Sequence, residues 1–206
     1  MVYTNYLLYT KPVENISYWD LFPQEFADAA FCGESTPEYM LIGEPGLTKM
    51  RDIIGNAHVI LLCRNPIERL ISAFKLLVHY NQIQLDKEGL DNFFLELIMQ
   101  ERPWFKHQLK YGDYVGAMRR YQKFFKEVCM IYYDDFFGKE SAILQQLSDF
   151  LGLKFDQPQF NSTFQQRIND LKLNYEPSGQ VRELLTEKLT SYVDTLNEYA
   201  GRELMK

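Results

Sequence analysis

Short apolar runs alternate along the chain with longer stretches whose apolar residues recur every three or four positions. The short runs are typical of buried strands, and the longer stretches are typical of helices that turn one face to a core. The pattern predicts strands over 26–32, 58–63 and 128–132. It predicts helices over 47–54, 66–80, 90–100, 114–125, 141–151 and 181–199. Strands that alternate with helices indicate a three-layer α/β fold, with helices on both sides of a mainly parallel sheet.

The boundary between the second predicted strand and the helix after it is the most informative part of the sequence. Asn65 suits the N-cap, and Pro66 suits the first helical position. Such a helix start favours anions, because free backbone N–H groups and the helix dipole point to one place. Arg64 stands there with a planar guanidinium that suits phosphate oxygens, although a lone arginine more often forms a surface ion pair. Asn65, Arg69 and Ser72 share one helix face. This pattern predicts a nucleotide-phosphate site.

The motif Arg64-Asn-Pro-x-x-Arg69-x-x-Ser72-Ala-Phe resembles the 3′-phosphate-binding segment of the sulfotransferases that use 3′-phosphoadenosine 5′-phosphosulfate (PAPS). The resemblance implies that Arg64 and Ser72 hold the 3′-phosphate, and it makes Asn65 and Arg69 further candidates for cofactor binding. Asn65 replaces the more usual aspartate and keeps the capping role. The family's fold is like that of the P-loop nucleotide hydrolases. The implied activity is transfer of a sulfuryl group from PAPS to a hydroxyl acceptor.

Other segments resemble the same family in the same order. Residues 33–39 have the sequence Gly-Glu-Ser-Thr-Pro-Glu-Tyr, similar to a Glu-Lys-Ser/Thr-Pro-x-Tyr segment of the branch that acts on glycosaminoglycans. This likeness makes Ser35, Thr36 and Tyr39 candidates for substrate binding and slightly favours a glycan acceptor. Lipid, small phenol and protein tyrosine remain open as acceptors. The other similar segments are 18–23, 111–114, 130–136 and 150–153.

One family feature has no counterpart in the sequence. Family members begin with a strand and a Pro-Lys-x-Gly-Thr-Thr loop that cradles the 5′-phosphosulfate, and no segment of residues 1–206 has this form. Residues 1–8 are similar to sequence just downstream of that loop. We therefore expect a single sulfotransferase-like domain over 1–206 that lacks the family's first strand and loop. Its turnover is expected to be weak or absent.

The catalytic base is open at this stage. Transfer to a hydroxyl needs a group that takes the acceptor's proton. The histidine segment of the family's cytosolic branch and the glutamate of the glycosaminoglycan branch have no counterpart here, which leaves His107 and Glu34 as candidates. In the family, a loop before the last helix often supplies basic residues that close over the nucleotide. Arg167 and Lys172 are candidates for that role.

Composition narrows the classes of function. A net charge of −6 argues against a general nucleic-acid binder but permits one anionic cofactor. No apolar run approaches the length of a membrane span, and no signal peptide opens the sequence. Three cysteines without metal-ligand spacing predict no metal site and favour a reducing compartment. We expect a cytoplasmic protein, or one of the Golgi lumen if an N-terminal anchor has been removed.

Two rival functions remain. A non-catalytic binding protein with a degenerate sulfotransferase fold would not respond to the nucleotide. A nucleotide kinase-like phosphotransferase would need a Gly-rich Lys-Ser/Thr loop and Mg²⁺ ligands, neither of which the sequence shows. The expected partners are a nucleotide cosubstrate and a hydroxyl-bearing acceptor, and the oligomeric state is open.

Overall fold

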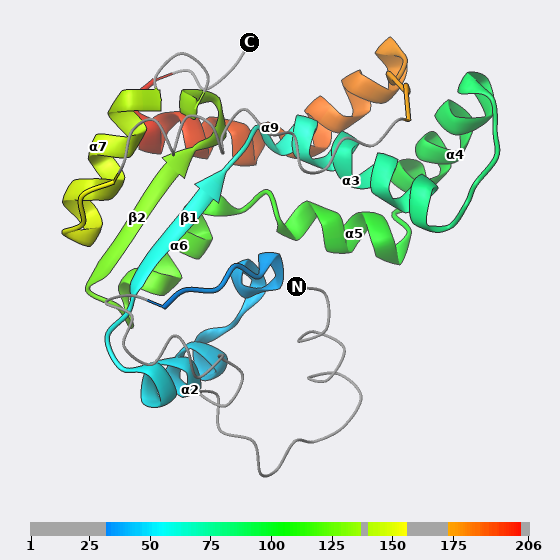
Figure 1. Ribbon diagram of the computed structural model, residues 1–206. Coiled ribbons are helices and arrows are strands. Elements are labelled where there is room, and N and C mark those ends of the chain that lie inside the picture. Colours follow the sequence, from blue (N-terminus) through cyan, green and yellow to red (C-terminus); the bar gives the residue numbers. More distant parts are fainter. Residues whose placement is uncertain (1–31, 137–139, 156–172, 203–206) are drawn as a thin grey trace. The chain divides into compact units, whose positions relative to one another are not determined.

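The computed structural model describes residues 32–136, 140–155 and 173–202 (Figure 1). Contacts within the chain divide it into a first unit, Met1–Tyr39, and a second unit, Met40–Lys206. The second unit contains the sheet, the long helices and the motif around Arg64, so the fold is described there.

Two parallel strands form the sheet in the described part of the chain. Strand β1 (His58–Cys63) pairs with β2 (Glu127–Tyr132), in a register that begins with His58 opposite Glu127 and ends with Cys63 opposite Tyr132. Helices lie on both faces of this sheet (Figure 1). The predicted α/β class is therefore confirmed, and the residues that follow the two strands emerge at the same sheet edge.

The helices predicted from the hydrophobic periodicity agree closely with those observed, but the pattern missed three short ones, η3 (Pro37–Leu41), α5 (Pro103–Lys110) and η4 (Tyr133–Phe136). Helix α5 is only eight residues long and starts at Pro103, which is too short for a periodic pattern to stand out. The helix predicted to reach residue 125 ends at Gln122. The strand predicted over 26–32 lies outside the described residues except for Cys32, which is not in a strand. The helices are η3 (Pro37–Leu41), α2 (Glu44–Ile54), α3 (Pro66–Tyr80), α4 (Lys87–Met99), α5 (Pro103–Lys110), α6 (Tyr114–Gln122), η4 (Tyr133–Phe136), α7 (Glu140–Leu151) and α9 (Gly179–Ala200).

The two faces of the sheet are covered to different extents. Alternate residues such as Leu61 and Met130 pack against α6 and the end of α9. On the other face, Ile131 of β2 packs against α7. On that same face, Ile60 and Leu62 of β1 are 40% and 52% exposed. The expectation that this strand is buried on both faces was therefore wrong, because α7 covers only the β2 side.

The largest core cluster lies away from the sheet, where α3, α4, α5 and α9 meet. Phe74 of α3 stacks on Phe94 of α4 with ring centroids 3.9 Å apart, and both side chains are fully buried. Tyr175 packs against Phe74, and its hydroxyl donates to the Asp91 carboxylate at 2.7 Å. This cluster fixes α3, the helix that carries the predicted phosphate-binding residues.

Candidate functional site

The candidate site lies at the carboxyl ends of the two parallel strands. Arg64 follows β1, and Tyr133 follows β2. The guanidinium carbon of Arg64 lies 5.1 Å from the centroid of the Tyr133 ring. A cation over an aromatic face at this distance is attracted by the ring quadrupole. Tyr133 therefore restricts the positions that the Arg64 guanidinium takes at the strand ends, where α/β proteins usually bind their ligands.

Arg64 and Ser72 keep their polar groups available. Both side chains are half-buried, and neither makes a hydrogen bond or ion pair with another described residue. An arginine that is held by an aromatic ring but has unused donors fits a phosphate or sulfate oxygen well. These two residues therefore remain the strongest candidates for binding an anion.

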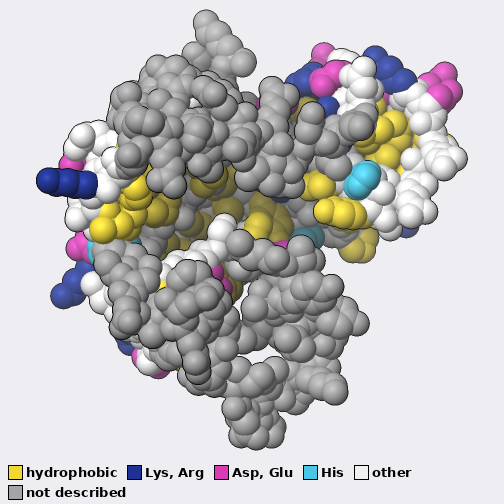
Figure 2. All heavy atoms as spheres, viewed as in Figure 1, with side chains coloured by type: hydrophobic (Ala, Val, Ile, Leu, Met, Phe, Trp, Pro, Cys, Tyr) yellow, Lys and Arg dark blue, Asp and Glu magenta, His cyan; other side chains and the backbone are white. Residues whose placement is uncertain are grey.

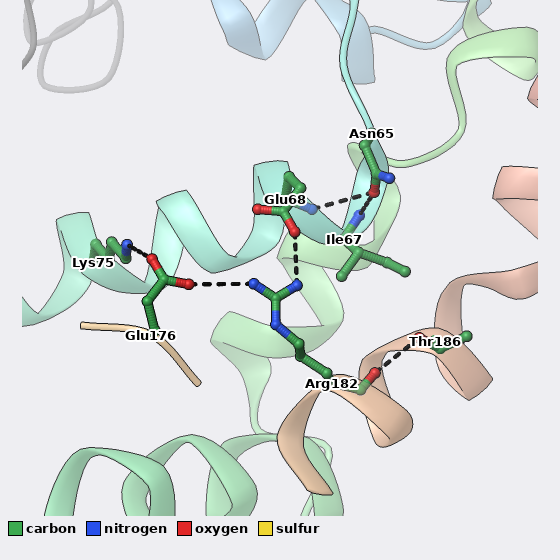
Figure 3. A network of polar contacts seen from close by, with 7 residues as sticks. All are labelled: Asn65, Ile67, Glu68, Lys75, Glu176, Arg182 and Thr186. Atoms are coloured by element: carbon green, nitrogen blue, oxygen red, sulfur yellow. Dashed lines mark hydrogen bonds and ion pairs between the residues drawn. The ribbon is translucent and has the colours of Figure 1, made fainter. Parts of the chain in front are cut away.

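The start of α3 differs from the sequence-based expectation. The Asn65 side-chain oxygen accepts hydrogen bonds from the N–H groups of Ile67 (2.8 Å) and Glu68 (3.3 Å), as Figure 3 shows. Pro66 has no N–H, and the Arg69 N–H donates to the Asn65 carbonyl at 2.8 Å. The predicted cap at Asn65 is confirmed. The expected free backbone donors at this helix start are absent, since the chain itself satisfies them. An anion here must be held by side chains.

Arg69 is engaged inside the protein. Its two terminal nitrogens donate to the side-chain oxygen of Gln108 (2.8 Å) and to the Gln108 carbonyl (2.7 Å). The guanidinium carbon also lies 5.3 Å from the ring centroid of Tyr111. Burial is the main cause that lowers the pKa of Arg69. We therefore expect Arg69 to hold α3 against α5, and the following variant tests its predicted contact with a nucleotide.

Arg69→Ala is expected to destabilise the fold by about 2 kcal/mol, because it leaves two Gln108 oxygens without their charged donor. Chemical denaturation of the variant and the wild type measures this difference. Nucleotide affinity, measured below the melting transition, is expected to stay within about threefold of the wild type. A large loss of affinity with unchanged stability would instead assign Arg69 to the nucleotide.

Two carboxylates, Asp134 and Asp135, follow β2 at the sheet edge where Arg64 follows β1. Burial raises the pKa of Asp134, while the nearby Arg64 and Arg202 act in the opposite direction. One Asp134 oxygen is buried and has no hydrogen-bond partner among the residues that the structure describes. Asp135 forms an ion pair with Arg202, whose guanidinium carbon lies 5.2 Å from the centroid of the Tyr132 ring. The site thus combines an available cation with carboxylates that limit its net positive charge.

Cys63, which precedes Arg64, packs with Tyr114 in a buried core cluster. Burial raises the pKa of the Cys63 thiol from 9.0 to about 12, and burial likewise raises the pKa of Tyr114 to about 12. A thiol held neutral in this way is a poor nucleophile. Cys63 therefore belongs to the packing beneath the site and not to its chemistry.

In the native protein at neutral pH, iodoacetamide is expected to modify the exposed Cys32 and to leave Cys63 unmodified. Peptide mass spectrometry before and after denaturation measures this. The raised pKa of Cys63 also predicts a pH effect on stability. The contribution of the neutral thiol is complete below pH 9.0 and is lost as the pH rises toward about 12, since only the unfolded thiol ionises early. Equal labelling of both cysteines in the native state would contradict the burial of Cys63.

A chain of ion pairs links α3, α9 and the segment just before α9 (Figure 3). Arg182 of α9 bridges Glu68 (2.8 Å) and Glu176 (3.3 Å), and Lys75 pairs with Glu176 at 3.1 Å. Glu68, Ser72 and Lys75 are spaced by four and three residues, so they share one helix face. The network ties α9 to the face of α3 that also carries Ser72.

The remaining predicted residues belong to other segments of the chain. In the first unit, the Tyr39 hydroxyl donates to Glu34 at 2.7 Å, Thr36 is half-buried and Ser35 is exposed. These four residues were the candidates for substrate contact and, in the case of Glu34, for the base.

His107 is exposed on α5, and its ring nitrogen lies 3.5 Å from the Tyr111 hydroxyl. It thus touches the aromatic ring that also packs against Arg69. Arg167 and Lys172 lie outside the described residues.

The sequence analysis did not predict that Tyr133 and Asp134 lie near Arg64. The available signal was the pair of predicted strands at 58–63 and 128–132. Parallel strands bring their carboxyl ends to one sheet edge. Pairing of these two strands would therefore have predicted that residues 64 and 133 lie next to each other.

Within the described ranges, no group of three or more histidine, cysteine or acidic side chains is arranged to hold a metal ion. None of the helices in those ranges combines the length and the apolar character that crossing a bilayer requires.

Comparison with known proteins places the chain in a family. A parallel sheet with candidate ligand residues at its carboxyl edge is the arrangement of a ligand-binding α/β protein. The model of the sulfotransferase domain matches residues 52–190, so the chain belongs to the sulfotransferase family. No curated protein matches the sequence.

A solved structure supports the same fold. The crystal structure of a sulfotransferase from Alicyclobacillus acidocaldarius resembles this chain with a TM-score of 0.56 and 22% sequence identity. The match covers 81% of this chain and 63% of the other, so the chain spans less than two thirds of that protein.

Proposed function

We propose that this sulfotransferase-family chain binds PAPS, or its product 3′-phosphoadenosine 5′-phosphate, and that Arg64 and Ser72 hold the 3′-phosphate. The observation that supports this most is the half-buried guanidinium of Arg64, which stacks on Tyr133 and has no hydrogen-bond partner among the described residues. The match of residues 52–190 to the sulfotransferase domain supports the same choice of ligand.

Side chains carry the binding in this proposal. Arg64 donates two parallel hydrogen bonds to phosphate oxygens, and the Ser72 hydroxyl donates a third. Arg69 and Asn65 act behind them, the first by holding α3 to α5 and the second by capping α3. Because its backbone donors are already satisfied, α3 adds only its dipole.

The reaction proposed is sulfuryl transfer from the nucleotide to a hydroxyl. The acceptor oxygen forms a bond to sulfur, the bond from sulfur to the 5′-phosphate oxygen breaks, and a base removes the hydroxyl proton. His107 and Glu34 stay the candidate bases, and a glycan is the favoured acceptor. Since residues 1–206 contain no loop of the Pro-Lys-x-Gly-Thr-Thr form, we propose that the chain alone turns over slowly.

The test is a transfer assay with ³⁵S-labelled PAPS and four acceptors, namely a glycosaminoglycan oligosaccharide, a lipid alcohol, a small phenol and a tyrosine peptide. We expect nucleotide binding together with transfer close to the background rate. Brisk transfer by the 206-residue chain would contradict slow turnover, while an absence of any nucleotide binding would contradict the proposed function as a whole.

A non-catalytic binding protein is the second candidate, favoured by the same missing loop. It predicts that neither PAPS nor 3′-phosphoadenosine 5′-phosphate shifts the melting temperature. It also predicts that substitution of Arg64 leaves ligand response unchanged. The first candidate predicts the opposite in both measurements, so one set of melting curves separates them.

A further inference from the structure

Charged and aromatic side chains form a cluster at the end of β2. Arg64 lies over the Tyr133 ring, with its guanidinium carbon 5.1 Å from the ring centroid. Arg202, just after α9, lies over the Tyr132 ring at 5.2 Å. Asp134 follows Tyr133 directly, and the charges of both arginines act on its carboxyl group. The cluster thus brings an acidic side chain within electrostatic reach of the guanidinium that is proposed to bind the 3′-phosphate.

The Asp134 carboxyl group is poorly solvated. Its side chain is half-buried, and burial is the largest of the influences that raise its pKa above the ordinary value of 3.8. Arg64 and Arg202 lower this pKa, whereas the neighbouring Asp135 raises it. Charges interact more strongly where water screens them less. The protonation of Asp134 is therefore sensitive to any charge that is added at Arg64.

The neighbours of Asp134 differ in whether their charges are already matched. Asp135 forms an ion pair with Arg202. Helix α7 packs against this segment through the apolar side chains of Ile143 and Leu147. Among the described residues, the charges that act on Asp134 are thus one matched pair and the guanidinium of Arg64. Arg64 is the member of the cluster whose charge a bound anion would neutralise.

We propose that Asp134 opposes the binding of the 3′-phosphate at Arg64, and that its carboxylate takes up a proton from the solvent when the nucleotide binds. A phosphate at Arg64 neutralises the cation that favours ionised Asp134 and adds a like charge beside it. Protonation of the carboxylate ends this repulsion. By linkage, protonation strengthens nucleotide binding by the same factor by which binding strengthens protonation. The inference rests on the proposed function and adds to it a residue that limits the affinity.

This coupling gives Asp134 a role in product release. While its carboxylate is ionised, it weakens the binding of PAPS and of 3′-phosphoadenosine 5′-phosphate alike, since both carry the 3′-phosphate. Differences in affinity among variants of one site lie mostly in the dissociation rate. Because product release limits the turnover of many enzymes, an acidic residue beside Arg64 keeps the product from binding too tightly.

The pH dependence follows from the sign of the coupling. Nucleotide binding raises the pKa of Asp134 above its value in the free protein, which is itself above 3.8. The affinity is therefore highest below both pKa values, falls as the pH rises from one to the other, and is lowest above both. The phosphate itself also ionises, near about pH 6, but it does so in the same way with every variant.

The experiment needs a control for general charge. Figure 2 shows acidic and basic side chains intermixed over the described surface at the α3–α4 end of the molecule. The whole chain has a net charge of −6, so removal of any carboxylate weakens a general repulsion of anions. Asp52→Asn makes the same change of charge on the exposed face of α2. This helix precedes the start of β1, and the six residues of β1 place Arg64 about 20 Å further along the strand.

The test is calorimetric titration of the full chain with 3′-phosphoadenosine 5′-phosphate at about pH 5 and about pH 8. Asp134→Asn is expected to bind about tenfold more tightly than the wild type at the higher pH, with a smaller gain at the lower pH. Asp134→Glu keeps the charge and is expected to keep the pH dependence of the wild type. Asp52→Asn is expected to change the affinity by less than about twofold at either pH.

Proton uptake separates this coupling from an effect on packing. In buffers with different ionisation enthalpies, the wild type is expected to take up more protons per bound nucleotide than Asp134→Asn near about pH 5. Equal proton uptake, or a ratio of affinities that is the same at both pH values, would overturn the inference and leave the proposed function intact. Absence of nucleotide binding in both the wild type and Asp134→Asn would overturn both proposals.

Discussion

Arg64→Ala is expected to abolish the rise in melting temperature that 3′-phosphoadenosine 5′-phosphate produces in the wild-type protein. The variant removes a guanidinium that is held against Tyr133 and has no other hydrogen-bond partner among the described residues. Each hydrogen bond to a charged group contributes about 1.5–3 kcal/mol, so loss of two weakens affinity by roughly a hundredfold or more. Because stabilisation follows ligand affinity by mass action, differential scanning fluorimetry at a fixed nucleotide concentration measures the loss.

Arg119→Ala is the matched control for this experiment. Arg119 is an exposed arginine of α6, and the variant makes the same change of net charge. It is expected to keep the full nucleotide-induced shift. A shift in Arg64→Ala as large as in Arg119→Ala would mean that Arg64 does not contact the nucleotide.

Phe74→Ala is expected to lower the free energy of unfolding by about 3–5 kcal/mol, which is large compared with the stability of a typical domain. Phe74 is fully buried, stacks on Phe94 and also packs against Phe93, Trp104 and Tyr175. Its loss leaves a cavity at the point where α3, α4 and the segment before α9 meet. Urea denaturation followed by circular dichroism measures the change.

Phe155→Ala tests whether that effect comes from burial. Phe155 is 39% exposed, and its replacement is expected to change the free energy of unfolding by less than about 0.5 kcal/mol. Similar losses in the two variants would contradict the assignment of Phe74 to the core that supports the phosphate-binding helix.

The elements that the sequence predicted best are those whose ends carry local signals. The strand at His58–Cys63 and the helix at Pro66–Tyr80 agree with the prediction at both ends. The apolar run stops at Arg64, and Asn65 and Pro66 mark the helix start, so short-range chemistry decides both boundaries. Helix α5 also begins with a proline, but the Arg102 side chain before it makes no capping hydrogen bond, and its eight residues complete little more than two turns.

The candidate site was predictable only in part. The residue types at Arg64 and Ser72 were visible in the motif, and so was the cap at Asn65. Two features depend on tertiary contacts that sequence periodicity does not carry. Arg69 finds Gln108 on a helix that was not predicted, and Arg64 finds Tyr133 through the pairing of β1 with β2. The fold therefore distinguishes the two arginines of the motif. Arg69 donates hydrogen bonds to Gln108, whereas the Arg64 side chain donates none to the described residues.

The charge at the site also depends on the fold. Asp134 and Asp135 lie 70 and 71 residues after Arg64 in the sequence. In the fold, the Arg64 charge acts on the pKa of Asp134, and Asp135 pairs with Arg202. A balanced site of this kind favours an anion that is bound by directed hydrogen bonds over one that is attracted by net charge alone. This balance of charges therefore agrees with a phosphate that Arg64 binds at one defined position.

The most direct test of the central claim compares two nucleotides by calorimetry on the wild-type chain. 3′-Phosphoadenosine 5′-phosphate and adenosine 5′-phosphate differ only in the phosphate that Arg64 and Ser72 are proposed to hold. We predict that removing the 3′-phosphate weakens binding by roughly a hundredfold or more. Equal affinities for the two nucleotides would show that this phosphate has no site on the protein, and would contradict the account.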